Sequence, residues 1–188
     1  MGLDMYAARK FYVQNWDSPE EERFSVEVAY GGQPLKTLDH ERVSVIEEDV
    51  MYWRKANHIH AWFVDNVQNG NDDCGTYIVS VGNLRELLST CQKVLEASTL
   101  VDGTVYMGTI WGPRDPEPVE QREPGKVIED PTVAKQLLPT RAGFFFGSTE
   151  YDEEYLTDVK DTQEWAAHML SDLEKADTPS DIVYSSSW

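Results

Sequence analysis

The sequence predicts an α+β fold in which a small, mainly antiparallel sheet packs against about three helices. Three observations predict it: alternating apolar residues near the N-terminus, a short β-prone segment near the C-terminus, and three stretches whose apolar residues recur with helical spacing. The 188 residues fit one domain and can bury a core without disulfides. We therefore expect a single domain over residues 1–188.

The sheet is predicted from three segments. Residues 3–13 alternate in the manner of a half-buried strand, and residues 24–30 do so again before the turn at Gly31 and Gly32. Near the other end of the chain, residues 182–184 can form a last strand that closes the sheet beside the first one.

The helices are predicted from charge and periodicity. The acidic residues 47–49 precede a helical pattern that runs to about Gln68, and acids suit the positive end of a helix dipole. Apolar residues over 84–95 form a complete amphipathic stripe, which places Cys91 in the core. The last helix is expected to run to about Lys175.

Two further segments have distinctive compositions: one is expected to be a surface loop, and the other is expected to be buried. Residues 102–131 are rich in proline and glycine, so we expect a hairpin near 104–111 and then a long surface loop, which makes 102–131 a loop excursion from the domain. Phe144, Phe145 and Phe146 are expected to form a buried strand or an apolar segment under the last helix.

The chain is strongly acidic, with 34 Asp and Glu against 16 Lys and Arg and a net charge of −18. Repulsion by phosphates then opposes nonspecific binding to DNA, RNA or an anionic membrane, and it favours a partner with a basic surface. An equally open alternative is that the acids only keep the protein in solution.

The chain lacks the usual signals for export, metal binding or cofactors. No apolar stretch reaches the roughly 20 residues that cross a bilayer, and no secretion signal opens the sequence, so a cytoplasmic protein is expected. Cys74 and Cys91 form no CxxC pair, and His58 and His60 are too close in sequence to be helical metal ligands. Because no nucleotide or hydrolase motif occurs either, we expect no metal and no cofactor.

The segment from Tyr52 to Phe63 has the densest chemical content of the chain. On the expected helix, His60 lies within the apolar face, where it is either a core histidine with a buried hydrogen bond or a general base in a cleft. Trp62 lies on another side of the helix together with Met51, Lys55 and His58. There it can stack on a ring or anchor an interface, unless the helix is covered on both sides. No catalytic residue is assigned, and His60 is the candidate if the protein is an enzyme. The candidate binding residues are Met51, Arg54, Lys55, His58, His60 and Trp62.

Negative charge is concentrated late in the chain. Residues 150–181 contain eleven acidic residues and two lysines. On a helix, Glu150, Glu154, Asp158 and Asp161 line one face with steps of about 6 Å. The row is either a solvated acidic face or part of a DNA mimic, although duplex DNA is more densely charged, at one charge per roughly 1.7 Å.

Several segments together resemble a known family. They are Met1–Tyr6, Tyr52–Asn57 with Ile59, His60 and Trp62–Val64, Asp72–Cys74, Leu137–Pro139, Gly143–Glu150 and Ser187–Trp188. These segments resemble a family of small proteins found in tailed phages and bacterial genomes. The resemblance implies a phage or prophage context and supplies no mechanism. His58 departs from the small or amide residue of the family at that position, which favours His60 over His58 for any catalytic role.

Charge without a recognisable catalytic motif favours a non-enzymatic accessory protein. We expect it to bind and inhibit a protein of the bacterial host, such as a defence effector or a nucleic-acid enzyme, through an acidic surface and an aromatic anchor. The alternative is a nucleotide-binding protein, either a sponge for a signalling nucleotide or a small hydrolase, that uses the helix from Trp53 to Trp62. A homodimer stays open as well.

Overall fold

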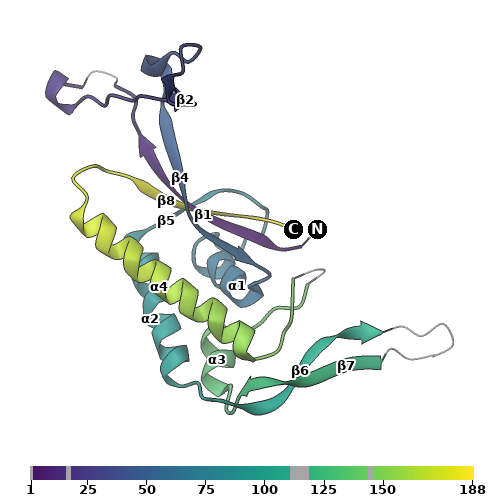
Figure 1. Ribbon diagram of the computed structural model, residues 1–188. Coiled ribbons are helices and arrows are strands. Elements are labelled where there is room, and N and C mark those ends of the chain that lie inside the picture. The colour runs from purple at the N-terminus through teal and green to yellow at the C-terminus, as the bar shows by residue number, and fades with distance from the viewer. Residues whose placement is uncertain (1, 16–17, 111–118, 144–145) are drawn as a thin grey trace.

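The computed structural model describes residues 2–15, 18–110, 119–143 and 146–188, which form the α+β fold that the sequence predicts (Figure 1). In chain order the described elements are β1 (Asp4–Tyr12), a 3₁₀ turn (Glu20–Glu22), β2 (Ala29–Tyr30), β3 (Gln33–Pro34), a second 3₁₀ turn (His40–Arg42), β4 (Val45–Arg54), α1 (Asn57–Asn66), β5 (Tyr77–Val79), α2 (Val81–Glu96), β6 (Leu100–Ile110), β7 (Val119–Ile128), α3 (Thr132–Leu137), α4 (Glu153–Lys175) and β8 (Asp181–Ser187).

The main sheet is antiparallel and has four strands in the order β4–β1–β8–β5. β1 lies between β4 and β8, so the first and last strands are neighbours, with Asp4 opposite Ser187. Figure 1 shows the two chain ends side by side as a result. The predicted N-terminal strand, the predicted C-terminal strand and their pairing are confirmed.

One face of the sheet builds the core together with the helices. Met5, Ala7, Trp53 and Tyr184 point to this face, and none of them is more than 3% exposed. α2 and α4 pack against each other and supply apolar stripes, as predicted, and Cys91 is fully buried. The buried apolar side chains of the two helices are Leu84, Leu87, Cys91 and Val94 of α2, and Tyr155, Val159, Trp165, Ala166, Met169 and Leu170 of α4.

Aromatic contacts join α1 to the sheet and to α4. Phe63 of α1 stacks on Tyr184 of β8 with ring centroids 3.9 Å apart. Trp53 of β4 meets Phe63 edge-on at 5.7 Å and Trp165 of α4 at 5.2 Å, and its indole N–H donates to the Thr162 hydroxyl at 2.8 Å. Since edge-on and offset ring pairs add to the energy of burial, this cluster fixes α1 on the sheet.

The helix predicted from residues 47–49 onward is wrong in its first half. Residues 45–54 form β4, and the helix begins only at Asn57. Val45, Ile46, Tyr52 and Trp53 are β-branched or aromatic and suit a strand, and β1 offers a ladder along the whole segment. The acids 47–49 therefore lie exposed on a strand at the edge of the sheet and do not begin a helix.

Two segments extend from this body, at opposite ends of it in Figure 1. One is the hairpin of β6 and β7. The sequence predicted a hairpin near 104–111 and then a loop, but β6 fills most of 104–111 as a single strand and its partner β7 lies within the predicted loop. Prolines are tolerated there because each strand of a two-stranded hairpin has a free edge. The other extension carries β2 and β3, and only residues 29–30 of the strand predicted at 24–30 are in regular structure. They belong to a separate two-stranded sheet, so the prediction that this segment joins the main sheet is wrong.

Of the three consecutive phenylalanines, the structure describes only Phe146. Phe144 and Phe145 lie outside the described residues, while Phe146 is half-buried and packs against the core. Within the described parts of the chain, none of the helices combines the length and the apolar character that crossing a bilayer requires.

Candidate functional site

The structure separates residues that the sequence placed on one helix face. Because the helix begins at Asn57, the expected grouping of Met51 and Lys55 with His58 and Trp62 on one helical side is wrong. The predicted binding residues are distributed as Met51 and Arg54 on β4, Lys55 in the turn after it, and His58, His60 and Trp62 on α1.

Trp62 is buried, with 6% of its surface exposed. Its ring meets Phe63 edge-on at 5.4 Å, within a helix that has eight of its ten residues buried. The expectation of an exposed indole is therefore wrong, and the alternative in which α1 is covered on both sides is the observed arrangement. Stacking of a nucleotide on this indole would require the core to open.

His60 is a buried histidine with both ring nitrogens engaged. Nδ1 lies 2.7 Å from the Tyr184 hydroxyl, and Nε2 lies 3.2 Å from Oδ2 of Asp72. The other carboxylate oxygen, Oδ1 of Asp72, accepts from the Trp188 indole N–H. Burial lowers the pKa of His60, while the Asp72 carboxylate acts in the opposite direction. A neutral ring that accepts from Tyr184 and donates to Asp72 satisfies this geometry, so neither nitrogen is free to take a proton from a substrate.

Predicted residues of both charge signs meet at one small pocket, of about 150 Å³. Three of its residues were predicted to bind a ligand or partner, and three were predicted to form the acidic surface. The pocket is lined by Arg54, Lys55, His58, Gly147, Ser148, Glu150, Asp152, Glu154, Tyr155 and Asp158. We call it the α4 pocket, because it lies where the turn between β4 and α1 meets the first turns of α4.

Asn57 ties the segment before α4 to the start of α1. Its side-chain amide donates to the carbonyl oxygens of Phe146 at 3.1 Å and Ser148 at 2.8 Å, and its Oδ1 accepts from the Arg141 backbone N–H at 2.8 Å. Asn57 is 1% exposed, so these bonds replace water that the amide loses on burial. They place Gly147 and Ser148 along the α4 pocket.

The turn beside the pocket has an unusual backbone. Lys55 has φ of 61°, a left-handed conformation that costs a residue with a side chain about 1 kcal/mol or more. Gly147 packs directly on it, and a Cβ at Gly147 would come within 2.8 Å of the Lys55 carbonyl oxygen. Glycine is therefore required at residue 147 on two grounds, since its own φ is 97°.

His58 lines the α4 pocket and is 3% exposed. Its ring packs on Tyr155 with centroids 4.2 Å apart, and its Nε2 has no hydrogen-bond partner among the described residues. Burial lowers the pKa of His58 to about 3, so the imidazole is neutral near pH 7. A buried nitrogen without a partner is uncommon in folded proteins, which makes His58 the most informative polar group of this pocket.

The acids of the pocket differ in their surroundings. Glu150 is paired with Arg122 of the β6–β7 hairpin at 3.1 Å, and Asp152 caps α4 by accepting from the Tyr155 backbone N–H. Among the described residues Glu154 and Asp158 make no ion pair. Burial, reinforced by the carboxylates of Glu154, Asp161 and Asp152, raises the pKa of Asp158 to about 7.

The raised pKa of Asp158 predicts that the stability of the protein depends on pH. Because the folded protein retains a proton on Asp158 that the unfolded chain releases near pH 4, the free energy of unfolding should fall as pH rises from about 4 to about 7. Asp158→Asn should remove this dependence and exceed the wild type in stability at about pH 8 by about 1–2 kcal/mol. Urea titrations at about pH 5 and pH 8 measure this dependence. The matched control is Asp177→Asn, because Asp177 is exposed and is not one of the carboxylates that act on Asp158. An equal change in stability between the two pH values in the wild type and in Asp158→Asn would contradict the prediction.

The predicted row of acids is only partly helical. Glu150 precedes α4, which begins at Glu153, so the four acids do not form one helical face. Glu154, Asp158 and Asp161 follow one another along α4, with Asp161 exposed beyond the pocket. DNA mimicry by this surface stays a prediction.

The sheet face opposite the core carries an apolar surface that the sequence did not identify as a site. Tyr6 lies opposite Tyr52 across β1 and β4, and Ile78 belongs to the same face through its pairing with Val183, the partner of Ala8. We call Tyr6, Tyr52 and Ile78 the open-face patch; they are 41%, 50% and 62% exposed. The two tyrosine rings lie 5.3 Å apart, and the Tyr52 hydroxyl donates to Asp4.

The alternation of residues 3–13 already placed Tyr6 on the face away from Met5 and Ala7. Tyr52 was missed because it was assigned to a helix, although the β-prone composition of residues 50–53 was the available signal.

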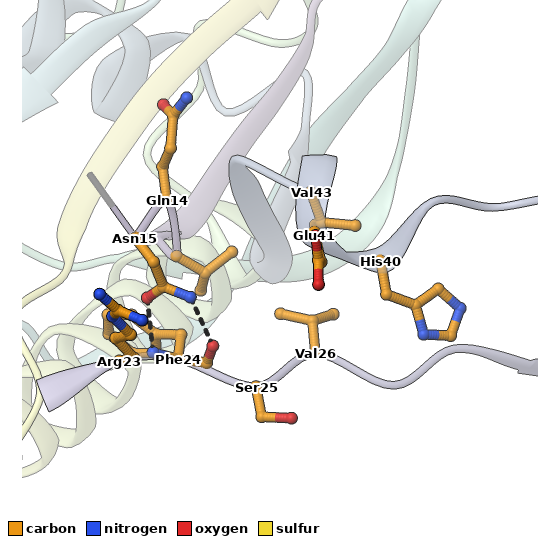
Figure 2. A pocket seen from close by; sticks show the side chains of 10 residues that line it. Gln14, Asn15, Arg23, Phe24, Ser25, Val26, His40, Glu41 and Val43 are labelled. Atoms are coloured by element: carbon orange, nitrogen blue, oxygen red, sulfur yellow. Dashed lines mark hydrogen bonds between the residues drawn. The ribbon is translucent and has the colours of Figure 1, made fainter. Parts of the chain in front are cut away.

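A larger hollow, of about 620 Å³, lies in the extension that carries β2 and β3 (Figure 2). It is open and contains none of the predicted site residues. Asn15 binds both the backbone N–H and the carbonyl oxygen of Phe24 at 2.7 Å, so its amide groups are satisfied within the chain. Figure 2 shows the His40 ring pointing away from Asn15 and Arg23, so these polar groups do not converge on one point.

In the described parts of the chain, no three His, Cys, Asp or Glu side chains are placed to hold a metal ion. Comparisons with protein-family models, with curated proteins and with solved structures found no match to this chain.

Proposed function

We propose that this protein binds and blocks a partner protein with a basic surface, and that it docks through the open-face patch. The observation that carries the proposal is the pair of exposed tyrosines, with Ile78, on the sheet face opposite the core. Tyrosines are enriched among the residues that dominate binding energy at protein interfaces. They supply the aromatic anchor that was expected at Trp62.

Acidic residues border the patch on β4. Glu47, Glu48 and Asp49 are exposed on the same strand as Tyr52, and β4 lies at the edge of the sheet. An apolar centre with a charged border is the usual composition of a protein interface. With a net charge of −18, the protein attracts basic surfaces and repels nucleic acid, so charge complementarity favours a basic protein as the partner.

The resemblance to proteins of tailed phages suggests which partner this is. We infer an accessory protein of a phage or prophage that inhibits a factor of the bacterial host. The alternative of a nucleotide-binding protein has less support from the geometry, because Trp53 and Trp62 are buried. The α4 pocket, at about 150 Å³, is also smaller than the roughly 300 Å³ or more typical of ligand sites.

The test is affinity capture from a bacterial lysate, followed by binding and inhibition assays with the purified partner. We expect a basic protein whose dissociation constant weakens about tenfold or more between low and moderate salt. Tyr52→Thr, which keeps a β-prone residue, should weaken binding at least about tenfold. Tyr30→Thr is the matched control, because Tyr30 is 83% exposed in the β2–β3 hairpin and lies outside the patch.

Two results would contradict the proposal. One is a purified partner that binds equally well at low and moderate salt. The other is equal binding by the wild type and Tyr52→Thr when circular dichroism shows both to be folded.

A further inference from the structure

We propose that the α4 pocket binds an organic cation that donates hydrogen bonds, namely the guanidinium or ammonium end of an arginine or lysine side chain. That this side chain belongs to the docked partner rests on the function proposed above. The pocket volume of about 150 Å³ suits the end of one side chain better than a whole metabolite. Arg54 links the two sites, because it lines the pocket and lies two residues after Tyr52 on β4.

The α4 side of the pocket is negative and lacks a counter-charge. Every charged group that shifts the pKa of Asp158 is an acid, namely Glu154, Asp161 and Asp152. Glu150, the remaining acid of the pocket, is already paired with Arg122. Arg54 and Lys55 line the pocket as well, yet neither forms an ion pair with a described carboxylate. A cation placed beside Glu154 and Asp158 would therefore relieve repulsion that the folded chain leaves uncompensated.

The unpartnered nitrogen of His58 specifies the kind of cation. His58 is neutral, 97% of its surface is buried, and its Nε2 has no partner among the described residues although its ring lines the pocket. A neutral imidazole nitrogen can accept a hydrogen bond from an N–H group. Guanidinium and primary ammonium groups provide such donors, whereas a quaternary ammonium group has none. A charge-assisted bond of this type is about twice as strong as a neutral one.

Contacts within the folded chain hold the lining of the α4 pocket in place. Asn57 holds Gly147 and Ser148 in place, and the Tyr155 ring packs on His58, so the pocket exists before any ligand arrives. A site formed in advance does not have to order its side chains on binding, which removes part of the entropic cost.

Calorimetric titration of the full chain with small probes tests the proposal. The cationic probes are N-acetyl-arginine amide and N-acetyl-lysine amide, and N-acetyl-citrulline amide is the uncharged control that keeps the shape of arginine. We expect the cations to bind and citrulline to bind at least about tenfold more weakly. Affinity should increase from about pH 6 to about pH 8, because Asp158 releases its proton over this range.

Two variants locate the site. Glu154→Gln should weaken binding of the cationic probe at least about tenfold. Glu153→Gln, the matched control, changes the neighbouring exposed residue, which does not line the pocket, and should bind like the wild type. His58→Phe retains a ring against Tyr155 and removes Nε2; where circular dichroism shows it folded, it should also bind more weakly.

The outcomes separate this inference from the proposed function. Equal binding of citrulline and arginine probes, absence of binding at millimolar concentrations, or unchanged affinity in Glu154→Gln would overturn the cation site. If any of these occurs while Tyr52→Thr still weakens binding of a basic partner, the pocket inference fails and the docking function stands. If the probes bind at the pocket and no basic partner is captured, the pocket inference stands and the docking function fails.

Discussion

Asn57→Ala should lower the free energy of unfolding by about 2–4 kcal/mol and abolish binding at the α4 pocket. The substitution removes three hydrogen bonds from a side chain that is 1% exposed, and it leaves two carbonyl oxygens and one N–H without their partners. Each unsatisfied buried group costs about 1–3 kcal/mol, reduced here because Arg141 and Gly147 are exposed and water can reach this segment. Urea unfolding measures the stability, and titration with the arginine probe measures the pocket.

Asn66→Ala is the control for this prediction. Asn66 is exposed on the same helix, and its amide donates one hydrogen bond, to the Trp62 carbonyl oxygen. We expect its loss to cost about 0.5–1 kcal/mol and to leave the pocket intact. Similar losses of stability in the two variants, with probe binding preserved in both, would mean that Asn57 does not hold the segment beside α4.

Phe63→Ala should cost about 3–5 kcal/mol, the largest effect expected of any single substitution considered. Phe63 is fully buried, stacks on Tyr184 at 3.9 Å and contacts Trp53 and Trp165, so alanine would leave a cavity between α1, the sheet and α4. Since a small domain is stable by only about 5–15 kcal/mol, this loss should move the thermal midpoint by many degrees. Thermal unfolding followed by near-ultraviolet circular dichroism, which reports on the packed indoles, measures it.

Phe63→Leu separates volume from ring stacking. Leucine fills most of the space and removes only the aromatic contacts, so a loss of about 1–2 kcal/mol is expected. Should alanine and leucine reduce stability equally, the cavity would not be the cause and the assigned packing of α1 would be in error.

Local sequence patterns correctly predicted the helices and strands whose secondary structure does not depend on contacts with distant parts of the chain. α2 and α4 each carry an apolar stripe that is unambiguous by itself, and β1 and β8 alternate or are β-prone over their length. Residues 45–54 failed because consecutive acids before an aromatic segment satisfy the rule for a helix start. The segment forms a strand because it pairs with β1, which lies more than thirty residues earlier, and a local sequence pattern does not show this pairing.

The candidate site also depends on contacts between distant parts of the chain, which local sequence patterns do not predict. Arg54, Lys55 and His58 were identified from residue type, as were Glu150, Glu154 and Asp158, but the sequence assigned the two sets to different surfaces. What joins them is the amide of Asn57, which bonds to backbone atoms of Phe146 and Ser148 about ninety positions later. No periodicity or spacing encodes such a contact. Trp62 failed for a related reason, since the cover over α1 comes from distant parts of the chain.

The pairing of β1 with β8 has a consequence for how the chain acquires its structure during synthesis. β1, one of the two inner strands of the sheet, is translated before the other described elements, whereas its neighbour β8 is translated after them, so Met5 cannot pair with Ser186 until then. Until then Phe63 lacks Tyr184, its stacking partner, and the nascent polypeptide exposes aromatic surface. Contacts between residues so far apart in sequence slow folding and prolong this exposure, and the net charge of −18 opposes association between the partly folded chains.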